Sequence, residues 1–184
     1  MTYDVAEAAL EQRLPFPITV RPWDTVEVAD RGFFCTGDDY LPLHPNHAAK
    51  IGLLTSADAM KVWEWADYTI PWGWPDFAQG FANEENLRTH DCRRDKPRND
   101  AVRHWLSERG VPFGRTVYLL YGRHQVVETN WQMVVRYWDV FSWSVGYQML
   151  AIDHTRQWAC CFHHEDVIVF GRHAESLEAT RPLP

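Results

Sequence analysis

The strongest constraint on the fold is a change of hydrophobic period near residue 145. Before it, apolar residues recur three and four positions apart, at Trp131, Val134, Val135, Trp138 and Phe141. After it, the apolar runs are short, over 145–152, 157–162 and 166–171, and the turn-like sequences DHTR and HHE separate them. The first pattern predicts one buried face of a helix, and the second predicts strands joined by tight turns. The sequence therefore predicts a helix followed by an antiparallel meander.

Two further elements are expected before this helix. Asn99 or Asp100 is placed to cap a helix whose apolar face holds Val102, Trp105 and Leu106, and Gly110 ends it. The run TVYLLY over 116–121 then predicts a buried strand. Residues 99–173 are thus expected to form an α+β core. Its sheet would have about four strands, over 116–121, 145–152, 157–163 and 166–171, with the helices packed on one face.

The start of the main helix carries a local signal of its own. Thr129 is followed three residues later by Gln132, which fits the capping-box pattern. A helix is therefore expected near 129–141, with Trp131, Val134, Val135 and Trp138 buried against the sheet.

The N-terminal half lacks a long periodic segment. Prolines interrupt it at Pro15, Pro17, Pro22, Pro42, Pro45, Pro71 and Pro75. Ser56 is placed to cap a helix in which Ala59, Met60, Trp63 and Ala66 share a face. We expect residues 1–87 to be an irregular, loop-rich helical part and 88–100 to be a linker or exposed loop. Residues 1–184 are expected to form a single domain.

Charge is distributed unevenly along the chain. The net charge is −7, yet residues 24–85 hold eleven acids against three bases, Arg31, Lys50 and Lys61. So acidic a segment argues against nucleic-acid binding, which needs clustered Lys and Arg, and favours a cationic partner. The alternative is a solvated face that only keeps the protein in solution.

The chain carries no targeting or membrane signal. Acids occupy the first 14 residues where a secretory signal needs bases, and no apolar run approaches the roughly 20 residues of a membrane span. The four cysteines, Cys35, Cys92, Cys160 and Cys161, show no C-x-x-C spacing. A cytoplasmic, reduced protein is expected.

The sequence CCFHHEDVIVFG, residues 160–171, is the densest cluster of potential ligands. Side chains alternate between the two faces of a strand, so Cys160 and Cys161 would diverge, as would His163 and His164. Zinc motifs instead space their ligands so that they converge. The cluster is therefore interpreted as a polar hairpin turn, with no metal, no cofactor and no catalytic residue assigned to it. Metal binding and a catalytic His–acid pair are the alternatives.

The sequence PWGWPDF, residues 71–77, is the better interaction candidate. Trp72 and Trp74 stand in a proline-flanked loop, and rigid aromatic side chains anchor many protein interfaces. With them we assign to a binding surface the acids Asp38, Asp39, Asp76, Glu84 and Glu85. The alternative is a loop that folds back as a lid on the core.

Residues 104–171 resemble a group of small bacterial proteins without an established activity. The likeness rests on the pattern W-x-x-x-V-x-Y-W-D-x-F, which begins at Trp131, and on H-E-D-x-I-x-F-G, which begins at His164. It implies a bacterial origin and one α+β unit, and it transfers no catalytic residue. In general character the chain is also similar to the immunity proteins of bacterial toxin systems, which are small, acidic and aromatic-rich.

These observations give two functional hypotheses. The first is a non-catalytic immunity protein that neutralises a cognate toxin by occluding it through the acidic 24–85 segment and the loop tryptophans. The second is a hydrolase or metal-dependent nuclease that uses Asp153, His154, His163, His164 and Glu165. Successive hairpins of a meander turn at opposite ends of their shared strand, so Asp153 and Glu165 should lie roughly 20 Å apart. This separation ranks the enzyme second.

Overall fold

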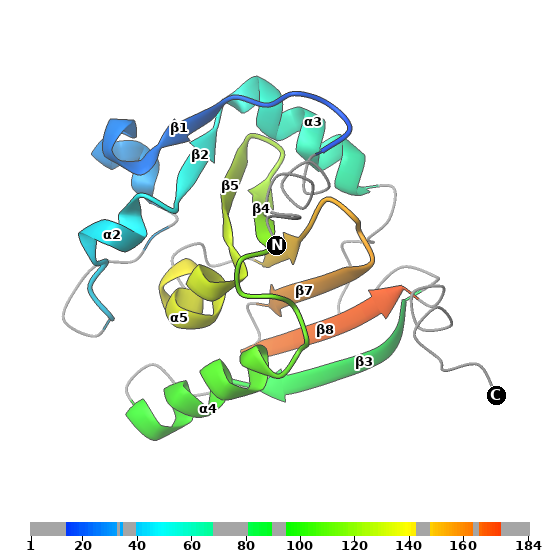
Figure 1. Ribbon diagram of the computed structural model, residues 1–184. Coiled ribbons are helices and arrows are strands. Elements are labelled where there is room, and N and C mark those ends of the chain that lie inside the picture. The colour runs from blue at the N-terminus through cyan, green and yellow to red at the C-terminus, as the bar shows by residue number, and fades with distance from the viewer. Residues whose placement is uncertain are drawn as a thin grey trace, which may run out of the picture.

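In the residues that the structure describes, eight strands form one antiparallel sheet at the centre of the molecule, in the order β1-β2-β5-β4-β6-β7-β8-β3. The computed structural model describes residues 14–32, 34, 40–67, 81–89, 95–142, 148–163 and 166–173. The strands are β1 (Val20–Pro22), β2 (Gly52–Leu54), β3 (Phe81–Arg88), β4 (Thr116–Gly122), β5 (Gln125–Asn130), β6 (Met149–Ile152), β7 (Trp158–His163) and β8 (Val167–His173). Figure 1 shows the sheet twisting from β1 and β2 at one end to β8 and β3 at the other.

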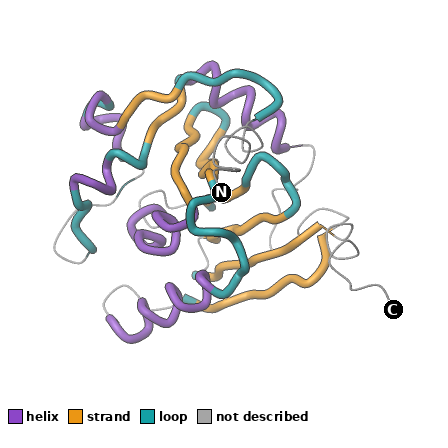
Figure 2. The backbone as a smooth tube through the Cα atoms, in the orientation of Figure 1, coloured by secondary structure: helices purple, strands orange, loops and turns teal. Residues whose placement is uncertain are grey.

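The helices lie around this sheet, as Figure 2 shows by colour. They are α2 (Pro45–Ala48), α3 (Ser56–Asp67), α4 (Lys96–Ser107) and α5 (Trp131–Ser142), with short 3-10 helices η1 (Trp23–Thr25) and η2 (Val28–Arg31). The α+β class expected from the sequence is confirmed. The predicted main helix is present as α5, and Trp131, Val134, Val135 and Trp138 are all buried.

The predicted meander is present as β6, β7 and β8. Met149 pairs with Phe162 across β6 and β7, and Trp158 pairs with Arg172 across β7 and β8. His163 pairs with Val167, so the chain reverses direction between these residues. The CCFHHEDVIVFG segment is therefore a strand, a reversal and a second strand, as the hairpin interpretation predicted.

The prediction of about four strands was wrong, because the sheet is twice that size. β5 was missed altogether: Thr129 lies in this strand, paired with Val117, and its hydroxyl donates to the Lys50 carbonyl. The helix cap is Asn130, whose Oδ1 accepts a hydrogen bond from the backbone N–H of Met133. A local capping pattern predicted the right helix and placed its cap one residue too early.

The two C-terminal helices, α4 and α5, pack on one face of the sheet as predicted, but α3 of the N-terminal half covers the other face. Residues of β4 alternate between two cores: Val117 and Leu119 pack with α4 and α5, whereas Tyr118 and Leu120 pack with α3. The sheet is therefore a middle layer with helices on both sides (Figure 1). Alternation along each strand puts one apolar row on each side, and each row requires its own cover.

The N-terminal half is not only helical, since β1, β2 and β3 all join the common sheet. Two helix caps also differ from expectation. Thr55, not Ser56, caps α3 by accepting the backbone N–H of Asp58. Asp95, rather than Asn99 or Asp100, caps α4 by accepting the backbone N–H of Arg98, so this helix begins inside the segment expected to be a linker.

One contact fixes the segment that leads into β2. Tyr137 of α5 is fully buried, and its hydroxyl lies 2.8 Å from Nδ1 of His47 in α2. The backbone N–H of His44 donates to the same hydroxyl at 3.4 Å. This contact holds α2 against α5 and thereby positions residues 49–52, which run on into β2.

Candidate functional site

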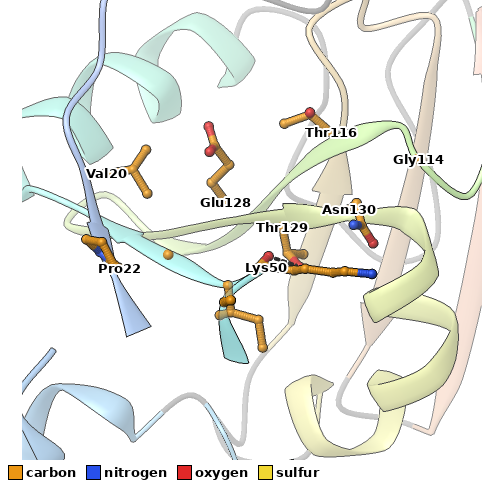
Figure 3. A pocket seen from close by; sticks show the side chains of 11 residues that line it. Val20, Pro22, Lys50, Gly114, Thr116, Glu128, Thr129 and Asn130 are labelled. Carbon is orange, nitrogen blue, oxygen red and sulfur yellow. Dashed lines mark hydrogen bonds between the residues drawn. The ribbon is translucent and has the colours of Figure 1, made fainter. Parts of the chain in front are cut away.

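A surface cavity of about 400 Å³ lies where β1, β2 and β5 meet the loop before β4. This volume is within the usual range of small-molecule pockets. Residues 49–52 and Gly114 form part of its wall. The side chains that give it chemical character are Val20, Pro22, Lys50, Thr116, Glu128 and Asn130 (Figure 3).

The strand register explains why these residues meet. Pro22 pairs with Gly52, Gly52 pairs with Glu128, and Glu128 pairs with Tyr118, so a single row crosses four strands. Directly paired residues project from the same face of a sheet. Gly52 contributes no side chain to this row. Val20 Cγ1 occupies the space that the Cβ of any other residue at position 52 would need. Glu128 is thereby placed beside apolar atoms of β1.

Glu128 has an unusual environment for a carboxylate. Burial raises its pKa above the ordinary value, and the hydrogen bond from the Tyr118 hydroxyl opposes this only in part. Burial likewise raises the pKa of Tyr118, followed by the charge and hydrogen bond of Glu128 and the charge of Asp153. Tyr118 therefore stays a phenol and donates to the carboxylate. The pair can therefore present the negative charge of the carboxylate to a ligand.

Lys50 supplies the opposite charge on the cavity wall. Its ammonium donates to Oε1 of Gln132 at 3.3 Å. Figure 3 shows the side chains of Lys50 and Glu128 pointing to opposite sides of β5. The two charges therefore do not face each other across the cavity. The side of the cavity that Glu128 lines is the anionic side.

Of the residues in the enzyme hypothesis that the structure describes, Asp153 and His163 do not meet. Asp153, only 2% exposed, accepts hydrogen bonds from the backbone and hydroxyl of Thr155, and its Oδ2 lies 3.6 Å from Nε of Arg115. It thus stabilises the β6–β7 turn. His163 lies at the far end of β7, roughly 20 Å away for six residues. His164 and Glu165 lie outside the described residues.

Neither thiol of β7 has the environment of a nucleophile. Cys160 is completely buried, which raises its thiol pKa well above the usual range, and burial raises the pKa of Cys161 to about 12. Within the described ranges, no group of three or more His, Cys, Asp or Glu side chains could hold a metal ion.

The predicted interface residues fall mostly outside the described part of the chain. Asp38, Asp39, Trp72, Trp74 and Asp76 lie outside the described residues. Glu84 and Glu85 lie in β3, which is an edge strand of the sheet.

Within the acidic 24–85 segment, residues 24–30, here named the acidic turn, form a surface that was not among the individually assigned binding residues. Asp24, Glu27 and Asp30 are exposed on it, and Val28 is 81% exposed. The only described cation paired with these acids is Arg21, at 3.4 Å from Asp30 in an exposed ion pair. The acids were counted in the sequence, but alternating acids and valines do not tell which valine is buried.

Aromatic packing anchors the acidic turn to the core. Val26 is buried, and the ring of Trp23 packs edge-on against Phe34 at 5.2 Å. Phe34 in turn packs edge-on against Phe141 of α5 at 5.3 Å. Arg31 lies over the Trp23 ring and donates to the Val26 carbonyl at 2.9 Å. The acidic turn is therefore held in place by aromatic packing against the core.

Comparison with protein-family models gives no match, and neither the curated proteins nor the solved structures include a significant match to this chain. The comparisons therefore transfer no activity to it. In the part of the chain that the structure describes, no helix has the length and apolar character needed to cross a membrane.

Proposed function

We propose that this protein binds a protein partner with a basic surface and blocks it, as an immunity protein blocks its toxin. The observation that carries the proposal is the acidic turn, where an 81%-exposed Val28 stands among Asp24, Glu27 and Asp30. An apolar centre within a charged rim is the usual anatomy of a protein interface.

The anchoring of the turn supports the same function. A surface that is held in place before binding loses less conformational entropy when the partner arrives. Val26, Trp23 and Phe34 hold the backbone on both sides of Val28. The acids would accelerate encounter with a cationic partner and select against anionic ones. The sequence candidates complete the proposed interface: Asp38, Asp39, Trp72, Trp74, Asp76, Glu84 and Glu85.

The test begins with the partner. A toxin gene is expected next to the gene of this protein, and co-expression should restore growth of cells that make the toxin. The double variant D24K/E27K should weaken binding of the purified toxin at least about tenfold at low ionic strength, and less at high salt, because salt screens exposed charges.

A matched control has the same change in net charge elsewhere. Glu64 and Glu108 are both exposed; Glu64 forms an ion pair with Arg123, and the Glu108 carboxylate lies 3.1 Å from Nε2 of His104. The variant E64K/E108K should leave affinity and protection close to those of the unmodified protein. Full protection by D24K/E27K, or equal losses in the two variants, would remove the acidic turn from the interface.

A further inference from the structure

The Glu128 carboxylate lacks a counter-charge in the described part of the molecule. Its one polar side-chain partner there is the Tyr118 hydroxyl, and no ion pair reaches it from a described Lys, Arg or His. A partly buried carboxylate without a cation loses hydration without full compensation. Because this carboxylate lines a cavity, a ligand can supply the missing charge.

We propose that the cavity is a binding site for an alkylammonium or guanidinium group, with Glu128 as its counter-ion. The same chemistry occurs in a lysine or arginine side chain of the partner and in a free small amine. The first source rests on the proposed function, whereas the second does not.

The surroundings of Glu128 fit such a group. Val20 and Pro22 offer apolar surface for an alkyl stem, and Thr116 lies on the same side of the sheet as the carboxylate (Figure 3). Phe113, with 50% of its surface exposed, directly precedes Gly114 of the cavity wall. Lys50 points away, toward Gln132, so it does not compete for the carboxylate.

The position of the cavity links it to the acidic turn. β1 contributes Val20 and Pro22 to the cavity, and the next residue, Trp23, begins η1 and anchors the turn. A partner that binds the acidic turn would therefore present basic side chains close to the cavity. A rigid anchor residue in a pocket is a common centre of binding energy in interfaces.

A stability measurement separates a binding role from a structural one. In E128Q the amide oxygen can still accept the Tyr118 hydrogen bond, and the buried charge is gone. The raised pKa of Glu128 means that the ionised group opposes folding near neutral pH. E128Q should therefore be at least as stable as the unmodified protein at pH 7, which a purely structural carboxylate would not allow.

The direct test uses n-butylguanidinium and n-butylammonium as probes, titrated into the full chain and followed by amide chemical shifts. We expect saturable binding in the millimolar range for so small a ligand, with shifts in β1, β2 and β5. The uncharged analogue n-butylurea should bind at least tenfold more weakly, as should the charged probes to E128Q. Equal binding by E128Q or by the urea, or the absence of saturation, would overturn the proposal.

The partner arm distinguishes the two sources. If a partner side chain enters the cavity, E128Q lowers affinity for the partner at least tenfold and n-butylguanidinium competes with it. If E128Q loses the probe but keeps the partner, the ligand is a free amine. Failure of the probe titration refutes this site and leaves the acidic-turn test of D24K/E27K unaffected.

Discussion

The side-chain amide of Asn99 in α4 donates a 2.7 Å hydrogen bond to Oδ2 of Asp139 in α5. Its oxygen accepts a second bond, of 3.0 Å, from the indole N–H of Trp138. All three side chains are buried, and Arg103 approaches the other Asp139 oxygen at 3.8 Å. One amide thus connects two helices and bonds one oxygen of a buried carboxylate and the N–H of a buried indole.

Replacing this amide should be costly. N99A leaves the Asp139 oxygen and the Trp138 N–H without their partner, and we expect a loss of about 3 kcal/mol in unfolding free energy. Urea denaturation measures the change. The neighbouring Asp100 is exposed, so D100A should change stability by less than about 1 kcal/mol. Similar losses in the two variants would contradict a central role for Asn99.

Gly52 should tolerate no side chain while Val20 faces it. A Cβ at Gly52 would overlap Val20 Cγ1 and lie 3.3 Å from the Arg21 carbonyl, so G52A should lose about 2 kcal/mol of stability. V20A removes the overlapping methyl group. The double variant V20A/G52A should then be more stable than the sum of the two single losses predicts. A double-mutant cycle in urea checks this, and additive losses would show that the overlap is not the cause.

Asp58 should make stability depend on pH in the acid range. The hydrogen bond from Lys61, with those from the Thr19 backbone and the Thr55 hydroxyl, lowers its pKa to about 2. Since the folded pKa lies below the unfolded value of about 3.9, the contribution is present above pH 4 and disappears as the pH falls toward 2.

D58N should accordingly be less stable than the unmodified protein at pH 7, with the difference shrinking toward pH 2. Thermal unfolding at a series of pH values measures it. Asp24 is exposed, and D24N provides a control whose effect should stay small throughout. A D58N deficit that is the same at pH 2 and pH 7 would show that the carboxylate charge does not stabilise the fold.

The thiols of β7 should be unreactive in the folded protein. In a C35S/C92S variant, which leaves Cys160 and Cys161, labelling by a disulfide reagent at pH 8 should be at least about 100-fold slower than in urea. The cause is the raised pKa of both thiols, together with the complete burial of Cys160; Cys161 is partly buried and packs against the core. Rapid labelling without urea would contradict their role as apolar core residues.

The C-terminal elements could be predicted because their signals are local. Trp131, Val134 and Trp138 lie on one helix face through their spacing alone, and the strands of the meander are long enough to show their apolar character. Antiparallel pairing of β6, β7 and β8 followed from the short turns between them. None of this required knowledge of distant residues.

The strands that the sequence did not predict form because they pair with segments elsewhere in the chain. β1 and β2 have three residues each, too few to show a period. The residues QVVETN form β5 because β4 pairs along one edge of this segment and β2 along the other. Locally, its Thr129 also fits the start of a helix, and only the neighbouring strands decide between the two.

The same distinction between local sequence and tertiary contacts applies to the acidic turn and to the cavity. By itself, the sequence determined which segments carry acids and where the apolar periods lie. Only the tertiary structure decided that Val28 is exposed while Val26 is buried, and that Gly52 and Glu128 are paired. Exposure and pairing depend on which other surfaces cover a residue, and those surfaces come from segments far apart in the chain. A local pattern contains the propensity of a segment, but not its neighbours in space.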